Sequence, residues 1–140
     1  MAITKEELIA LLNKDLEWEF AALIQYVQHA AVLTGAAYGD IQKELLIHAT
    51  EEHTHAVSLA EQIDFLGGVP TIAVEKRQVS PDPAVMLEQD LAGEQDAIDR
   101  YKARIRQAEE LQEYGLRRAL EDILIVEEEH KRDLLAALGK

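Results

Sequence analysis

The sequence predicts an all-α protein in which four long helices form one bundle. Residues that favour helix (Ala, Leu, Glu, Gln, Lys and Arg) dominate the 140 positions, and only three are proline. Apolar residues recur every three or four positions through four segments, as on the buried face of a helix. A chain of this length is expected to form one domain, residues 1–140, with a core of its own.

Local signals mark where each helix begins and ends. Thr4 with Glu7 three residues later is a capping box, and the Gly67-Gly68 pair is a C-cap signal. Asp82 followed by Pro83 is typical of a helix start. The predicted helices run from Thr4 to about Leu33, from about Asp40 to Leu66, from Pro83 to about Glu113, and from Tyr114 or Leu116 to Leu138.

The connections predict how the helices are arranged. The first and third are short, so each joins two antiparallel neighbours, giving helical hairpins over about 4–66 and 82–138. The second, residues 67–82, is long enough to span a helix of roughly 40 Å, at about 3.3 Å per extended residue. This long crossover predicts an up-down-down-up bundle.

Composition excludes several classes of function. The net charge of −13 argues against a nucleic-acid partner, because phosphate contacts need clustered Lys and Arg. No segment approaches the roughly 18 apolar residues of a membrane span, and MAITKEELIALL lacks the pattern of a secretory signal, so a cytoplasmic protein is expected. The absence of cysteine excludes disulfides and thiolate metal sites.

Acidic residues and histidines lie on the inward faces of the predicted helices. A Glu-x-x-His pair occurs in "ATEEHTHAV" and again in "VEEEHKRDL". Following the alternating spacing of four and three residues, each of these pairs occupies core positions, as does one glutamate on each of the other two helices. The resulting set is Glu19, Glu52, His55, Glu94, Glu127 and His130.

The inward residues repeat with a shift of 75 positions. Glu19, Tyr26, Glu52 and His55 recur as Glu94, Tyr101, Glu127 and His130, and Asp15 recurs as Asp90, together with several apolar positions. The two halves are therefore degenerate copies of one helical hairpin.

Burying four carboxylates together is costly unless their charge is balanced. The inward series contain no Lys or Arg between the acids, whereas two divalent cations would match four carboxylates and two neutral imidazoles. One Glu from each of two helices and Glu-x-x-His from each of the others is the ligand pattern of di-iron and di-manganese bundles. Oxygen and nitrogen ligands suit Fe or Mn, with Zn also possible.

These residues resemble the bacterioferritin and ferritin-like family over nearly the whole chain. The similarity lies in "LNKDLEWEFAALIQYVQHA", "EEHTHAVSLAEQIDFLGGVP", "LEQDLAGEQDAI" and "ILIVEEEHKRDLL". The resemblance implies terminal ligands at Glu19 and Glu94, bridging carboxylates at Glu52 and Glu127, histidine ligands at His55 and His130, and a tyrosine beside the centre at Tyr26. It implies oxidation of Fe²⁺ by O₂ or H₂O₂, with the ferric product stored or released.

The chain departs from the family at three points. His53 stands where bacterioferritin has a haem-ligating methionine, which argues against haem bound in that manner, although His53 could itself ligate iron. The family's short fifth helix is missing, so the expected homo-oligomer is a dimer or a larger shell. Position 97 is Ala, where rubrerythrins carry an additional carboxylate.

Two other functions stay open on the sequence alone. One is a peroxide-consuming di-iron or di-manganese oxidoreductase, similar to rubrerythrin or manganese catalase, that stores no mineral. The other is a non-enzymatic helical interaction module. Around the site, Tyr26 and Tyr101 are each expected to reach a carboxylate, and His29 and His48 to be satisfied core groups. Asp15 and Asp90 are expected to lie at the surface or near helix ends rather than to stage iron.

Overall fold

The computed structural model describes residues 2–140 and contains four long helices. They are α1 (Lys5–Val32), α2 (Gly39–Phe65), α3 (Pro83–Glu110) and α4 (Tyr114–Ala137), with one turn of 3-10 helix, η1 (Ala36–Tyr38), before α2. No strand occurs within the described residues. The predicted all-α class is therefore confirmed.

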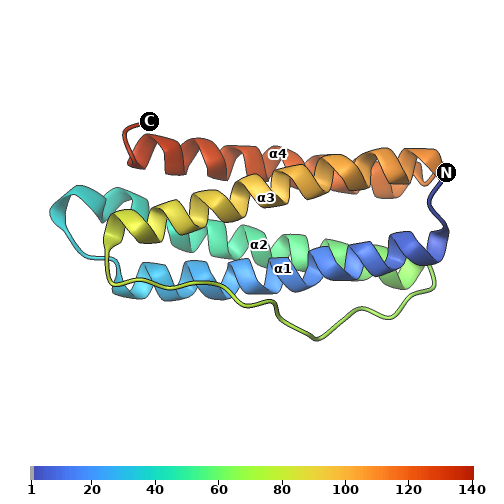
Figure 1. Cartoon of the computed structure of the whole chain (residues 1–140), viewed down its shortest axis with the longest axis horizontal. Helices are drawn as coiled ribbons and strands as arrows, with labels where there is room; N and C mark the ends of the chain where they lie inside the picture. The colour runs from blue at the N-terminus through green and yellow to red at the C-terminus, as the bar shows by residue number, and fades with distance from the viewer. Residues whose placement is uncertain (1) are drawn as a thin grey trace.

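The helices follow the predicted up-down-down-up order. In Figure 1, α1 and α2 run antiparallel, α2 and α3 run in the same direction, and α4 returns beside α3. The connection between α2 and α3 runs along the bundle beside α1. The Asn13 side chain holds it by donating from Nδ2 to the Val69 carbonyl (3.0 Å) and accepting from the Thr71 amide (2.8 Å). Further along α1, Gln25 Nε2 donates to the Gln78 carbonyl at 2.9 Å.

The sequence signals for three helix ends are confirmed. The Thr4 hydroxyl accepts from the Glu7 amide, and the Glu7 carboxylate accepts from the Thr4 amide. Asp82 accepts from the Val85 amide, with Pro83 in the first turn. At the end of α2, Gly67 has φ +95°, a left-handed conformation that glycine adopts without steric cost.

The predicted end of the third helix, about Glu113, was three residues too late. The helix ends at Glu110 because Gln112 adopts φ +58° and closes a Schellman motif. In this motif the Gln112 amide donates to the Glu109 carbonyl and the Glu113 amide to the Ala108 carbonyl, both at 2.9 Å. No glycine marks the position in the sequence.

The apolar core is divided into two parts by a polar layer. One part includes Leu8, Leu12, Leu59, Leu120 and Ile123. The other includes Ala30, Leu45, Met86, Leu87 and Leu134. All four helices contribute buried acidic or imidazole groups to the layer between them. The apolar parts on both sides stabilise the bundle, and their burial offsets the free-energy cost of burying polar groups in the layer.

None of the helices in residues 2–140 combines the length and the apolar character that crossing a membrane requires.

Candidate metal centre

The six predicted ligands all lie in the polar layer, each at most 5 % exposed. Glu19 lies on α1 and Glu94 on α3, while α2 and α4 each supply a Glu-x-x-His pair. Residues three apart lie on one face of a helix, so each pair faces the bundle axis together. The structure therefore brings together every residue that the sequence placed in the inward set.

The six side chains form two overlapping groups. One comprises Glu19, Glu52, His55 and Glu127, and the other comprises Glu52, Glu94, Glu127 and His130. Within each group, one ligand atom from every residue lies within 4.8 Å of the others. Glu52 and Glu127 belong to both groups. Such sharing is what two neighbouring cations bridged by two carboxylates require.

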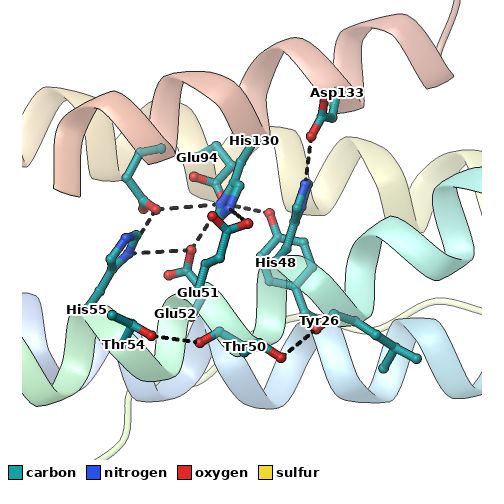
Figure 2. Close-up of polar contacts among 12 residues, drawn as sticks. Tyr26, His48, Thr50, Glu51, Glu52, Thr54, His55, Glu94, His130 and Asp133 are labelled. Carbon is teal, nitrogen blue, oxygen red and sulfur yellow. Dashed lines mark hydrogen bonds and ion pairs between the residues drawn. The ribbon is translucent and has the colours of Figure 1, made fainter. Parts of the chain in front are cut away.

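The histidines approach the shared carboxylates with their Nδ1 atoms (Figure 2). His55 Nδ1 lies 3.2 Å from Glu127 Oε1 and 3.7 Å from Glu19 Oε2. His130 Nδ1 lies 3.0 Å from Glu52 Oε1 and 3.2 Å from Glu94 Oε1. Each nitrogen therefore faces carboxylates from both halves of the chain.

Many polar atoms of this layer have no hydrogen-bond partner. They include both carboxylate oxygens of Glu52, one oxygen each of Glu19, Glu94 and Glu127, and Nδ1 of His55. Buried polar atoms in proteins are normally paired, and leaving one unpaired costs about 1–3 kcal/mol. Carboxylate oxygens and imidazole nitrogens that converge without partners fit a pair of divalent cations.

The electrostatics of the layer favour protons when no cation is bound. Burial, together with the charges of Glu127 and Glu19, raises the pKa of Glu52 well above its usual range. Burial and the charge of Glu94 raise the pKa of Glu127 to about 8. For His55, burial opposes the charged form, but the adjacent carboxylates of Glu127 and Glu19 outweigh it and raise the pKa to about 10. For His130, contact with Glu94 likewise outweighs burial and raises the pKa to about 9.

We expect metal affinity to rise with pH, because cations must displace these protons. Groups whose pKa is raised to about 8, 9 or 10 hold protons at pH 7 in the metal-free protein. Binding should therefore weaken as pH falls from 8 to 6 and should release at least two protons per centre at pH 7. Titration with Zn²⁺ in a weakly buffered indicator solution measures both effects. An affinity that does not change over this range would contradict the assignment.

Two tyrosines hold the outer carboxylates. The Tyr26 hydroxyl donates to Glu94 and the Tyr101 hydroxyl donates to Glu19, each from a fully buried position. Both tyrosines were expected to reach a carboxylate, and both do so. The two tyrosine–glutamate pairs are related by the 75-residue shift.

The sequence led us to expect Asp15 and Asp90 at the surface or near helix ends, but the structure places neither of them there. Both are at most 2 % exposed. Asp15 accepts from Arg104 Nε at 2.8 Å and from Arg100 Nε at 3.1 Å, and Asp90 contacts His29 Nδ1 at 2.9 Å. Extending the inward series on the third helix by three residues beyond Tyr101 would have shown that Arg104 faces inward, but not that it pairs with Asp15.

Glu51 and His53, which flank Glu52 on α2, differ in whether they contact the centre. Glu51 is half-buried, and its Oε1 lies 3.3 Å from His130 Nε2. Its carboxylate therefore contacts the side of the imidazole that faces away from the shared glutamates. His53 is exposed beside the apolar residues Leu23, Val27 and Leu46.

The arrangement defines a four-helix carboxylate protein, and comparisons with known proteins agree. The chain belongs to the ferritin family, whose model, described as a ferritin-like domain, matches residues 9–140. It is 30 % identical over 141 residues to a bacterioferritin of Brucella melitensis, covering 96 % of this chain and 88 % of that protein.

Two solved structures are similar throughout. One, of ferritin-like di-iron carboxylate proteins from Bacillus anthracis, has a TM-score of 0.93 and 34 % identity, covering 99 % of both chains. The other is the bacterioferritin-related dodecameric thioferritin of Bacteroides fragilis, with a TM-score of 0.90 and 31 % identity, covering 98 % of this chain and 87 % of that one.

Proposed function

We propose that the protein is a ferroxidase of the bacterioferritin type, which binds two Fe²⁺ ions and oxidises them for storage or detoxification. The observation that carries this proposal is the pair of overlapping groups that share Glu52 and Glu127. The ferritin-family match and the similarity to a bacterioferritin support it.

The proposed roles of the residues follow from their positions. Glu52 and Glu127 would bridge the two ions, since each belongs to both groups. Glu19 and His55 would complete one ligand set, and Glu94 and His130 the other. Tyr101 and Tyr26 orient Glu19 and Glu94 through their hydroxyls, which leaves one oxygen of each carboxylate free for the ion.

The substrate ions supply the redox chemistry. Two Fe²⁺ give up two electrons, which with two protons reduce H₂O₂ to two H₂O, or O₂ to one H₂O₂. Oxygen and nitrogen donors accept Mn²⁺ as well as Fe²⁺. The surrounding apolar layers exclude bulk water from the site.

We also propose that the protein forms a homo-oligomer through the outer face of α1 and α2. Ile24, Val27, Leu46, Ile47 and Val57 are 45–56 % exposed on these two helices. Apolar side chains gathered on one face are typical of a contact with another protein. The dodecameric assembly of the Bacteroides fragilis relative supports a second copy as the partner.

Aerobic titration of the metal-free protein with Fe²⁺ tests the function. Ferric absorbance gives the rate of oxidation, and iron that stays soluble gives the amount stored per chain. We expect a rapid phase that ends at about two irons per chain, the capacity of a two-metal centre. Soluble iron that continues to accumulate beyond this phase would indicate a mineralising shell.

Two outcomes would point to other functions. Peroxide turnover without net uptake of iron would favour a peroxide-consuming di-iron or di-manganese enzyme. No stoichiometric binding and no thermal stabilisation by Fe²⁺ or Mn²⁺ would instead indicate a helical interaction module.

A further inference from the structure

A third group of metal-ligand side chains lies beside the centre, between α2 and α4. It consists of Glu44, His48 and Asp133, and one ligand atom from each lies within 4.8 Å of the others. Glu44 and His48 are four residues apart and share one face of α2. His48 Nε2 lies 3.0 Å from Asp133 Oδ2 (Figure 2).

The His48 imidazole is buried without a full set of partners. Its side chain is 0 % exposed, its Nε2 has only the Asp133 carboxylate as a partner, and its Nδ1 has none. A neutral imidazole has one donor and one acceptor nitrogen, and both are normally satisfied when buried. The Asp133 carboxylate is thus the one partner of a buried imidazole, and Glu44 brings a second carboxylate to the same group.

The internal repeat provides a comparison within the same chain. Shifting by 75 residues relates His48 to Ile123, Glu44 to Ala119, and Asp133 to Ser58. Ile123 belongs to the apolar core at its end of the bundle. The fold therefore accepts an aliphatic residue at this position, and the three polar groups occur together in only one of the two related places.

The group is open to solvent on one side and contacts the centre on the other. A hollow of about 300 Å³ is lined by Glu44 and Asp133, together with Asp40. On the inner side, the His48 and His130 rings stack with their centroids 3.9 Å apart and their planes at 21°. An ion from solvent can thus reach the carboxylates of Glu44 and Asp133 without entering the buried layer.

We propose that Glu44, His48 and Asp133 form a third cation site, which holds one divalent transition-metal ion. Two carboxylates and one imidazole are donors that suit Fe²⁺, Mn²⁺, Co²⁺ or Zn²⁺. Metal–ligand bonds of about 2.0–2.2 Å bring ligand atoms within about 4.3 Å of each other, so a small rotation of the partly exposed carboxylates completes the site. A role in delivering substrate iron to the centre rests on the proposed function, whereas the site itself does not.

The test counts bound Co²⁺ in the absence of oxygen, by calorimetry and by visible absorbance of the bound ion. The metal-free full-length protein is expected to bind three Co²⁺ per chain. His48→Ile, which installs the residue found at the related position, is expected to bind two. The double variant Glu44→Ala, Asp133→Ser is also expected to bind two, and it leaves the ring stacked on His130 unchanged. Glu61→Gln, an exposed change elsewhere on α2, should still bind three.

A second pair of measurements separates this site from the proposed function. The double variant Glu52→Ala, Glu127→Ala, which removes both shared carboxylates, should retain one Co²⁺ that is lost when His48→Ile is added. This result holds even if the protein does not oxidise Fe²⁺. The proposal is overturned if the unaltered protein binds only two Co²⁺, or if the Glu44→Ala, Asp133→Ser variant binds three. Circular dichroism and the melting temperature of each metal-free variant verify that it is folded.

Discussion

Replacing Glu52 or Glu127 by alanine is expected to abolish rapid oxidation of Fe²⁺. Each carboxylate belongs to both ligand groups, so one substitution removes a ligand from both ions at once. Changes to residues that only orient a ligand already cost 10–100-fold in many metal sites, and we therefore expect a loss of more than about a hundredfold. The rate is measured by stopped-flow absorbance of the ferric product at two Fe²⁺ per chain.

Glu129→Gln is the matched control for this prediction. It removes a carboxylate from α4 only two residues from Glu127, but from an exposed position outside both groups. Its rate should equal that of the unaltered protein. If Glu52→Ala and Glu127→Ala both oxidise Fe²⁺ at the normal rate, the assignment of the centre is wrong.

The second large effect concerns thermal stability, where Glu127→Gln should act in opposite directions with and without metal. Burial and the charge of Glu94 raise the pKa of Glu127 from 4.5 to about 8 in the folded chain. A carboxyl whose pKa is raised by folding lowers the free energy of unfolding, and this loss grows as pH rises from 4.5 toward 8. At pH 7 this cost reaches about 3 kcal/mol, at 1.36 kcal/mol per pH unit.

A neutral amide of the same shape avoids that cost. The metal-free Glu127→Gln variant is therefore expected to melt up to about 10 °C above the metal-free unaltered protein, at roughly 3 °C per kcal/mol. With metal the order should reverse, because the unaltered protein gains about 2.7 kcal/mol per ion at a hundredfold excess over Kd. The variant lacks a shared ligand and should gain much less.

Differential scanning calorimetry at pH 7, with chelator and then with Mn²⁺, measures both differences. Glu129→Gln again serves as the control and should follow the unaltered protein under both conditions. A metal-free variant that melts below the unaltered protein would show that the carboxylates of the layer do not oppose folding.

The fold could be predicted because its signals are local or periodic. Capping residues such as Thr4 and Asp82 act within four positions, and the inward series repeats along each helix. The crossover follows from the length of one linker. The end of α3 was missed because Gln112 adopts a left-handed conformation that its residue type does not indicate.

The candidate centre could be predicted for a related reason. Glu-x-x-His on an apolar face predicts inward polar groups, and the 75-residue repeat relates the two ligand sets. Neither the Glu-x-x-His pattern nor the repeat predicts which side chains of different helices contact each other. The Arg104–Asp15 pair and the approach of Glu51 to His130 depend on how two helices lie against each other, which no single-helix pattern specifies.

The repeat also determines how the two hairpins depend on each other. Each contributes a glutamate and a Glu-x-x-His pair, which is three of the four residues in its own ligand group. The fourth residue is a carboxylate from the opposite hairpin: Glu127 for the first group and Glu52 for the second. Each hairpin thus supplies one carboxylate to the group of the other, as the subunits of a symmetric dimer contribute equivalent residues across their interface. This reciprocal arrangement of a dimer thus occurs within one chain, and neither group of side chains is complete until both hairpins are in place.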